Sequence, residues 1–204
     1  MYLYFKVILD FIFPPSEDEK CIASVTLETF QKKYSLRRTS DITTLASFAD
    51  PIVRAAIHLN KFHNHNRAQE LLASLLVHYL NSQIMKDTIL IPIPLSKKRQ
   101  QERGHNQVIS VAIRALASTH KVELVDTVLI KTADTKPQTT LSRQERLHNL
   151  KGVYACDPRT VHSIKNKHIL LLDDVSTTGT TLHEAKATLL PHDPASITCI
   201  ALAH

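Results

Sequence analysis

The sequence predicts an α/β fold with a largely parallel sheet flanked by helices, because short apolar runs alternate with helix-patterned segments. Residues 88–94 read Thr-Ile-Leu-Ile-Pro-Ile-Pro, residues 169–172 read Ile-Leu-Leu-Leu, and residues 197–202 form a third apolar run. Continuous runs of this length are typical of strands buried on both faces, as in parallel sheets. The chain has 204 residues, of which 43% are hydrophobic, which suits one sizeable core and is too short for two ordinary domains.

The segments between these runs have the spacing of helices. Apolar residues recur at helical spacing through residues 51–80, on both sides of a polar turn at residues 63–66. Further helices are predicted over residues 106–118 and 182–190, and one more strand over residues 127–130. Alternation of strands and helices indicates βαβ units.

Residues 1–50 are predicted to form a small N-terminal appendage to a main domain of residues 51–204. The apolar start, residues 1–13, contains Lys6 and Asp10, lacks a small-residue cleavage site and is too short to span a membrane. We expect an amphipathic helix there, and a cytoplasmic protein without a membrane span. The three cysteines are widely spaced and match neither a disulfide framework nor a zinc site, so zinc is not expected.

A net charge of +6 and a pI near 9.3 favour an anionic partner, either a phosphorylated small molecule or nucleic acid, although a basic surface also serves solubility. Four basic residues lie in a predicted loop after the strand of residues 88–94, where they would meet a pyrophosphate, a nucleic-acid backbone or solvent. They are Lys97, Lys98, Arg99 and Arg103. His63 and His65 have no acidic or cysteine ligand nearby, so no protein metal site is predicted. With aromatic residues at 5%, no base-stacking platform is evident.

Acidic and hydroxyl residues crowd the loop predicted after the strand of residues 169–172. Ligands of open parallel sheets lie beyond the carboxyl ends of the strands, where such groups converge. Asp173 and Asp174 would accept hydrogen bonds from the cis diol of a ribose. Thr181 and Glu184 have capping-box spacing, which predicts a helix N-terminus that attracts a phosphate. The remaining phosphate-binding candidates are Ser176, Thr177, Thr178, Gly179 and Thr180.

Other anion-binding loops fit these residues less well. A P-loop ends in Gly-Lys-Ser/Thr, and a dinucleotide fingerprint needs three glycines where this loop has only Gly179. An acidic turn that merely caps a helix is the remaining structural alternative.

Residues 169–181 resemble the thirteen-residue phosphoribosyl pyrophosphate motif of type I phosphoribosyltransferases: four apolar residues, two acids, then Thr-Gly-x-Thr. The resemblance implies the type I phosphoribosyltransferase fold. It also implies that Asp173 and Asp174 bind the ribose hydroxyls and that residues 177–181 bind the 5-phosphate. Mg²⁺ would be carried by the pyrophosphate and ribose oxygens of phosphoribosyl pyrophosphate.

Three further segments are similar to those of ComF-type competence proteins. Residues 91–99 read Ile-Pro-Ile-Pro-Leu-Ser-Lys-Lys-Arg, and residues 103–107 read Arg-Gly-His-Asn-Gln. His105 stands where that family has an aromatic residue, and only Cys21 lies where ComF proteins often have a four-cysteine zinc module. The third segment is polar, spans residues 131–149 and is predicted to be a mobile loop. Its candidate residues are Gln138, Leu141, Arg143, Arg146 and Asn149.

The ComF resemblance implies a protein that binds phosphoribosyl pyrophosphate and acts in DNA uptake, natural competence or DNA handling. Its expected partners are single-stranded DNA and the DNA-uptake machinery. The alternative is a catalytically active phosphoribosyltransferase, of nucleotide salvage or a related glycosyl transfer. A plain nucleic-acid-binding module is supported by charge alone. No nucleobase-binding hood is recognisable in residues 1–50, so the sequence does not decide between the first two.

Overall fold

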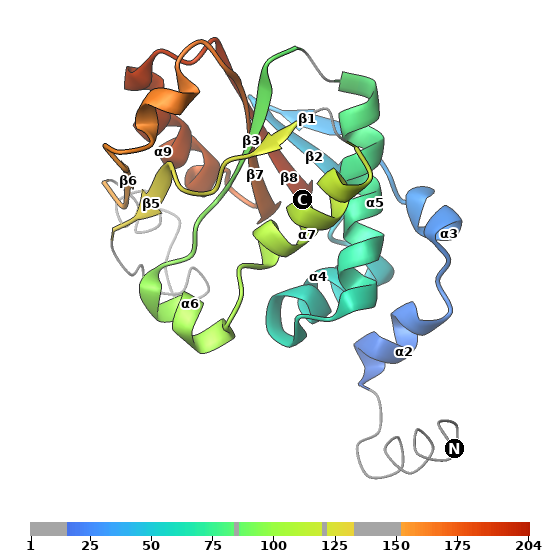
Figure 1. Ribbon diagram of the computed structural model, residues 1–204. Coiled ribbons are helices and arrows are strands. Elements are labelled where there is room, and N and C mark those ends of the chain that lie inside the picture. The colour runs from blue at the N-terminus through green and yellow to red at the C-terminus, as the bar shows by residue number, and fades with distance from the viewer. Residues whose placement is uncertain (1–15, 84–85, 120–121, 133–151) are drawn as a thin grey trace.

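The computed structural model describes residues 16–83, 86–119, 122–132 and 152–204 (Figure 1). In these residues the main element is a six-stranded sheet of order β1-β2-β8-β7-β3-β4, in which every neighbouring pair except β1 and β2 is parallel. The predicted α/β class with a largely parallel sheet is therefore confirmed. Its strands are β1 (Arg37–Thr39), β2 (Ile42–Ala46), β3 (Thr88–Pro92), β4 (Glu123–Leu124), β7 (His168–Val175) and β8 (Ser196–Ala203).

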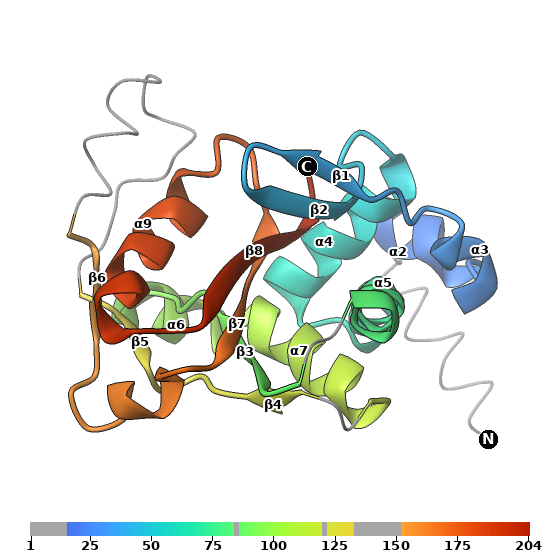
Figure 2. The same ribbon diagram turned by 90° about the horizontal axis from the view of Figure 1, so that it is seen from above.

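Helices cover both faces of this sheet (Figure 2). Leu170 and Leu172 of β7 pack into the core beneath one group of helices, whereas Ile169 and Leu171 pack into the core on the opposite face. The apolar run is continuous because alternate residues of a buried strand enter different cores. The first core includes α4 (Pro51–His63), α5 (Asn66–Gln83) and α7 (Gln107–Ala117), with α2 (Glu17–Ala23) and α3 (Leu27–Gln31) packed against them, and the second includes α9 (Thr180–Leu189).

Capping residues fix the ends of the longer helices. The Asp50 carboxylate accepts hydrogen bonds from the first N–H groups of α4, and Asn64 ends this helix in the left-handed conformation at φ 48°. Asn106 caps α7 in the same way, with its Oδ1 2.9 Å from the N–H of Val108. The helices predicted over residues 51–80, around the turn, and over residues 106–118 are therefore confirmed.

The predicted basic loop was wrong, because residues Lys97–Arg103 form a short helix, α6. Ser96 caps its N-terminus by accepting from Arg99 N–H, and Gly104 ends it at φ 71°. No residue of α6 is buried, so the helix lacks the apolar periodicity by which helices were predicted. The two capping residues were its only sequence signals.

Part of the predicted appendage belongs to the main sheet. β2 lies parallel to β8, with Ile42 opposite Cys199, and all five residues of β2 are buried. No strand was predicted here, because Thr43 and Thr44 are polar residues inside a buried strand. Residues 1–15, and with them the helix predicted over residues 1–13, lie outside the described residues.

The predicted strand of residues 127–130 corresponds to β5 (Leu129–Lys131), which lies outside the main sheet. It pairs antiparallel with β6 (Tyr154–Cys156) in a separate two-stranded sheet. The candidates of the predicted mobile loop fall between these strands and outside the described residues: Gln138, Leu141, Arg143, Arg146 and Asn149. The described residues also contain two short 3₁₀ helices, η2 (Val161–Ile164) and η3 (Leu190–His192). Among the helices of the described ranges, none is long and apolar enough to cross a membrane.

If β2 is integral to the fold, Leu45→Ala will lower the free energy of unfolding by about 2–5 kcal/mol, because Leu45 is fully buried in the core under the helices. Urea denaturation measures this loss. Leu36→Ala is the matched control, since Leu36 is 50% exposed and its truncation should change stability by no more than about 0.5 kcal/mol. Equal small losses would show that this strand is dispensable.

Candidate functional site

The two aspartates lie inside the strand rather than in an exposed loop. β7 extends to Val175, which pairs with Ala203 of β8, so Asp173 and Asp174 are the two residues before the last one of a central strand. Their exposures are only 8% and 7%. The sequence interpretation ended the strand too early, because an acidic pair in a buried strand contradicts the usual preference for apolar residues there.

Few direct partners compensate for the burial of this pair. Asp174 N–H donates to Asp173 Oδ1 at 2.8 Å, and Val175 N–H donates to Asp174 Oδ1 at 2.8 Å. Burial raises the pKa of Asp173 well above its ordinary value, and the neighbouring Asp174 charge raises it further, while Lys61 partly opposes the rise. Two adjacent carboxyl groups in this environment would be stabilised by a ligand that brings hydroxyl donors or a cation.

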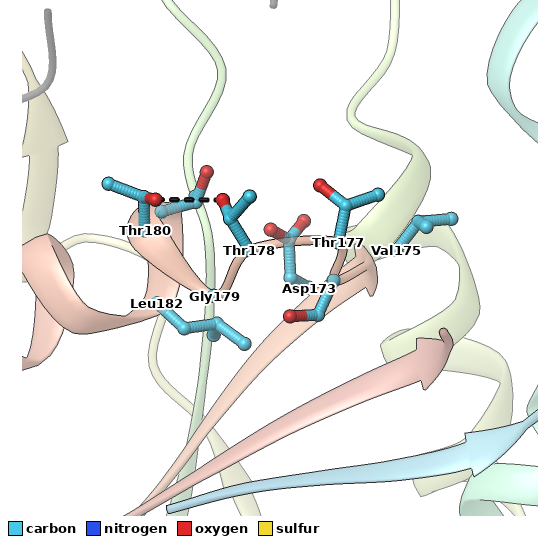
Figure 3. A pocket seen from close by; sticks show the side chains of 9 residues that line it. Asp173, Val175, Thr177, Thr178, Gly179, Thr180 and Leu182 are labelled. Atoms are coloured by element: carbon cyan, nitrogen blue, oxygen red, sulfur yellow. Dashed lines mark hydrogen bonds between the residues drawn. The ribbon is translucent and has the colours of Figure 1, made fainter. Parts of the chain in front are cut away.

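The hydroxyl-rich loop joins β7 to α9 directly beyond these aspartates (Figure 3). Gly179 is the N-cap of α9 at φ 76°, so the capping box predicted from Thr181 and Glu184 was wrong. In Figure 3 the side chains of Asp173, Thr177 and Thr178 project to the same side of the loop. Thr178 and Thr180 are joined by a 2.8 Å hydrogen bond between their hydroxyls. The loop thus presents hydroxyl groups beside a helix N-terminus, an arrangement suited to an anion.

The β1–β2 hairpin supports the loop from behind. A Cβ atom on Gly179 would lie 2.4 Å from Ile42 Cδ1, so a larger residue at this position would require the Ile42 side chain to shift. Asp41 accepts a 2.6 Å hydrogen bond from His183 and a 2.5 Å hydrogen bond from Lys186, both on α9. These hydrogen bonds, that of Lys186 above all, lower the pKa of Asp41 to about 2. Sequence reasoning missed this support because Asp41 is distant from α9 along the chain.

A crevice of about 630 Å³ opens beside the aspartates and the loop. Arg99 and Arg103 of the predicted basic cluster line this crevice together with both carboxyl groups. Lys97 and Lys98 are not among its lining residues, and Lys98 lies 4.0 Å from Glu102 in a weak ion pair on α6. The structure therefore separates the four basic residues into two groups. Other lining residues, which sequence reasoning did not select, include Lys61, Phe62, Gln107, Lys131 and Tyr154.

Gln107 connects a cationic wall of the crevice to the acidic one. Arg103 donates to Gln107 Oε1 at 3.0 Å, and Gln107 Nε2 donates to Asp174 Oδ2 at 3.0 Å. Burial lowers the pKa of Arg103, and the charge of Asp174 opposes that change, so the guanidinium remains charged. Gln107 stands in the Arg-Gly-His-Asn-Gln segment of the sequence, but residue type and spacing gave it no role.

Tyr154 lines the same crevice from β6. Its hydroxyl is buried and, in the part of the chain that the structure describes, has no hydrogen-bond partner. Burial raises the pKa of Tyr154, and the nearby charge of Asp173 raises it further. The ammonium group of Lys131 lies 5.5 Å from the centre of the Tyr154 ring.

The described ranges contain no group of three or more His, Cys, Asp or Glu side chains that could hold a metal ion, at His63 and His65 or elsewhere.

Comparison with known families identifies this fold. Residues 91–204 match the family described as the phosphoribosyl transferase domain, a span that includes β3, α6, the aspartate pair and the hydroxyl-rich loop. The chain therefore belongs to the phosphoribosyl transferase domain family, and its predicted fold is confirmed. Its curated relatives include the competence proteins ComFC and F, which confirms the ComF resemblance seen in the sequence.

Three of these relatives show the extent of the similarity. Competence protein ComFC of Bacillus subtilis is 34% identical over 105 residues, which are 52% of this chain and 39% of that protein. DNA utilization protein YhgH of Escherichia coli O157:H7 is 27% identical over 161 residues, covering 76% of this chain and 68% of the relative. Competence protein F of Haemophilus influenzae is 30% identical over 95 residues, 47% of this chain and 41% of the relative.

Solved structures align with this chain only weakly. The allosteric regulatory enzyme of purine biosynthesis aligns with a TM-score of 0.41 and 15% identity, over 65% of this chain and 25% of that chain. A hypoxanthine phosphoribosyltransferase from Staphylococcus aureus aligns with a TM-score of 0.38 and 16% identity, over 66% and 61% of the two chains.

The close contact between Gly179 and Ile42 predicts that alanine substitutions at two glycines differ in their cost to stability. Gly104→Ala should cost about 1–2 kcal/mol of stability, because Gly104 has φ 71° and nothing lies within 4 Å of an added Cβ. Gly179→Ala should cost about 1–3 kcal/mol more, because its Cβ would also displace Ile42. Chemical denaturation of both variants measures the difference. Equal losses would mean that the hairpin does not support the loop.

Proposed function

We propose that this protein binds phosphoribosyl pyrophosphate in the crevice and acts as a ComF-like protein of DNA uptake or DNA handling. Asp173 and Asp174 accept the ribose hydroxyls, and the loop of residues 176–181 holds the 5-phosphate at the N-terminus of α9. Arg99 and Arg103 hold the pyrophosphate. The observation that carries the proposal is the buried carboxyl pair, which lines the same crevice as these guanidinium groups and adjoins the hydroxyl-rich loop.

Each part of the crevice matches one part of this ligand. Guanidinium groups form charge-assisted hydrogen bonds with phosphate oxygens, which suits the wall made by α6. Hydroxyl groups and the helix N-terminus bind an anion without a full positive charge. The carboxyl groups, whose burial disfavours the ionised form of Asp173, gain donors when ribose hydroxyls occupy the space before them.

Magnesium fits the proposal as a companion of the ligand. The carboxylates of Asp173 and Asp174 are the oxygen ligands that Mg²⁺ prefers, and the ion usually combines one or two carboxylates with substrate phosphates and water. When bound, it would neutralise part of the charge of the pyrophosphate. The remaining ligands in this proposal are pyrophosphate and ribose oxygens.

The second candidate function is a catalytic phosphoribosyl transfer at the same site. The observation in its favour is the opposition of charges in the crevice: the carboxyl pair would stabilise positive charge on the ribose, and the two arginines would stabilise the departing pyrophosphate. Incubation with phosphoribosyl pyrophosphate, Mg²⁺ and a panel of nucleobases and amines tests this alternative. Pyrophosphate release that depends on one acceptor would establish it, whereas no release above the rate without protein would exclude it for that panel.

Phosphoribosyl pyrophosphate with Mg²⁺ is expected to raise the melting temperature, because a ligand that binds only the folded state stabilises it. At a hundredfold excess over Kd the gain is about 2.7 kcal/mol, or roughly 5–10 °C for a domain of this size. Adenosine 5′-triphosphate should have a smaller effect, since its ribose lacks a free 5-phosphate. Calorimetry that detects no heat of binding at millimolar ligand with folded protein would refute the site.

The separation of the basic residues predicts two different phenotypes for matched double variants. Arg99→Ala with Arg103→Ala should lose phosphoribosyl pyrophosphate binding, because both side chains line the crevice. Lys97→Ala with Lys98→Ala removes the same charge and should retain that ligand. If α6 also binds single-stranded DNA, the lysine pair will account for it, and its removal will flatten the salt dependence of DNA binding by about 1–2 units.

Titration of the wild type and both variants with each ligand, at two salt concentrations, separates these effects. Loss of phosphoribosyl pyrophosphate binding in the lysine variant alone would contradict the assignment. DNA affinity that does not change with salt would contradict a backbone contact.

A further inference from the structure

The two-stranded sheet of β5 and β6 forms part of the crevice wall. Lys131, the last residue of β5, pairs directly with Tyr154, the first residue of β6, and both residues line the crevice. These strands lie on the same side of the molecule as α6 and α9 in both views (Figures 1 and 2). The proposed function gives neither residue a role.

The packing of this small sheet fixes the position of Tyr154. The side chain is only 5% exposed and belongs, with Leu129 and Val153, to the core on the α9 side of the main sheet. Further along β6, the thiol of Cys156 donates to the carbonyl oxygen of Thr188 on α9 at 3.5 Å. The fold therefore holds the Tyr154 ring at the edge of the crevice.

The hydroxyl group is the part of Tyr154 that the core does not explain. Three buried side-chain atoms lack a hydrogen-bond partner among the residues that the structure describes: Asn60 Oδ1, Thr119 Oγ1 and the Tyr154 hydroxyl oxygen. Of these three residues, Tyr154 alone lines the crevice. Burying a hydroxyl without a partner is unfavourable, and a phenylalanine would fill the same space without this cost. A buried, unpartnered hydroxyl at a crevice indicates a ligand rather than a structural role.

The surroundings of the hydroxyl favour an anionic acceptor. Burial raises the pKa of Tyr154, and the charge of Asp173 raises it further, so the phenol keeps its proton and is available as a donor. The charge of Arg99, which also lines the crevice, opposes this rise. The ammonium group of Lys131 lies 5.5 Å from the ring centre. A phosphate oxygen is the acceptor that suits an O–H donor placed near two cations.

We infer that the Tyr154 hydroxyl is a further ligand-binding group of the crevice, which donates a hydrogen bond to a phosphate oxygen of the pyrophosphate arm. The identity of this ligand rests on the proposed function. Since the hydroxyl is buried in the empty crevice, binding requires a small rearrangement of the side chains around it. The hydroxyl lowers stability in the empty protein and contributes affinity in the complex, where it gains a charge-assisted hydrogen bond. One substitution therefore changes stability and affinity in opposite directions.

Tyr154→Phe tests the inference because it removes the hydroxyl and keeps the ring. Without ligand, its melting temperature should not fall and is expected to rise by about 2–4 °C, since an unpartnered polar group leaves the core. Titration calorimetry should show affinity for phosphoribosyl pyrophosphate with Mg²⁺ reduced about 10- to 100-fold, the effect of one hydrogen bond to a charged group. Affinity for inorganic pyrophosphate should fall by a similar factor, whereas affinity for ribose 5-phosphate should not change.

Tyr34→Phe is the matched control, because it removes a phenol hydroxyl elsewhere in the fold. Tyr34 is not among the residues that line the crevice, and its hydroxyl has a hydrogen-bond partner in Ser82. The control should melt about 1–4 °C below wild type and bind all three ligands as wild type does.

The same measurements can overturn the inference in several ways. Unchanged affinity of Tyr154→Phe for phosphoribosyl pyrophosphate would exclude the contact, and a melting temperature below that of wild type would show that the hydroxyl has a partner in the fold. An equal loss of ribose 5-phosphate binding would contradict the assignment to the pyrophosphate arm. Failure of folded wild type to bind either phosphoribosyl pyrophosphate or pyrophosphate would instead refute the proposed function, and this inference with it.

Discussion

The burial of two adjacent carboxyl groups at the end of the central strand is the constraint on which the candidate site depends. Asp173 and Asp174 are held in place by backbone pairing of β7 with its neighbours, so they cannot withdraw to solvent without breaking the sheet. Desolvation makes this arrangement unfavourable in the absence of a partner. Residues that cost stability at the carboxyl end of a parallel strand are typical of a ligand site rather than of a helix cap.

The surrounding elements are arranged to complement that pair. Gln107 accepts a hydrogen bond from Arg103 and donates one to Asp174. The His105 ring forms a hydrogen bond with the carbonyl oxygen of Arg103. On the other side of the strand, the β1–β2 hairpin supports the first turn of α9 through Asp41 and Ile42. The two groups of contacts come from distant parts of the chain and meet at one strand end, which is how a rigid scaffold places a charged site.

Much of this arrangement could be predicted from the sequence where a local pattern records it. The apolar runs predicted the parallel strands, and the thirteen residues from Ile169 predicted the loop that the structure places beside the crevice. Three features escaped prediction for physical reasons. α6 has no buried face, β2 contains two polar residues although it is buried, and the aspartates continue a strand although charged residues usually end one. The contacts of Gln107 and Asp41 join residues that are far apart in the sequence, so sequence spacing could not predict them.

The central claim is that the carboxyl pair is kept for a ligand at the expense of stability, and Asp173→Asn tests it most directly. Because burial raises the pKa of Asp173, the folded protein binds a proton there more readily than the unfolded chain, so this group lowers stability as the pH rises toward neutrality. The account predicts that Asp173→Asn raises the free energy of unfolding at pH 7 by about 0.5–2 kcal/mol, with a smaller gain at pH 4, and loses the stabilisation by phosphoribosyl pyrophosphate with Mg²⁺. A variant that is less stable than wild type at pH 7 and keeps the stabilisation by the ligand would contradict it.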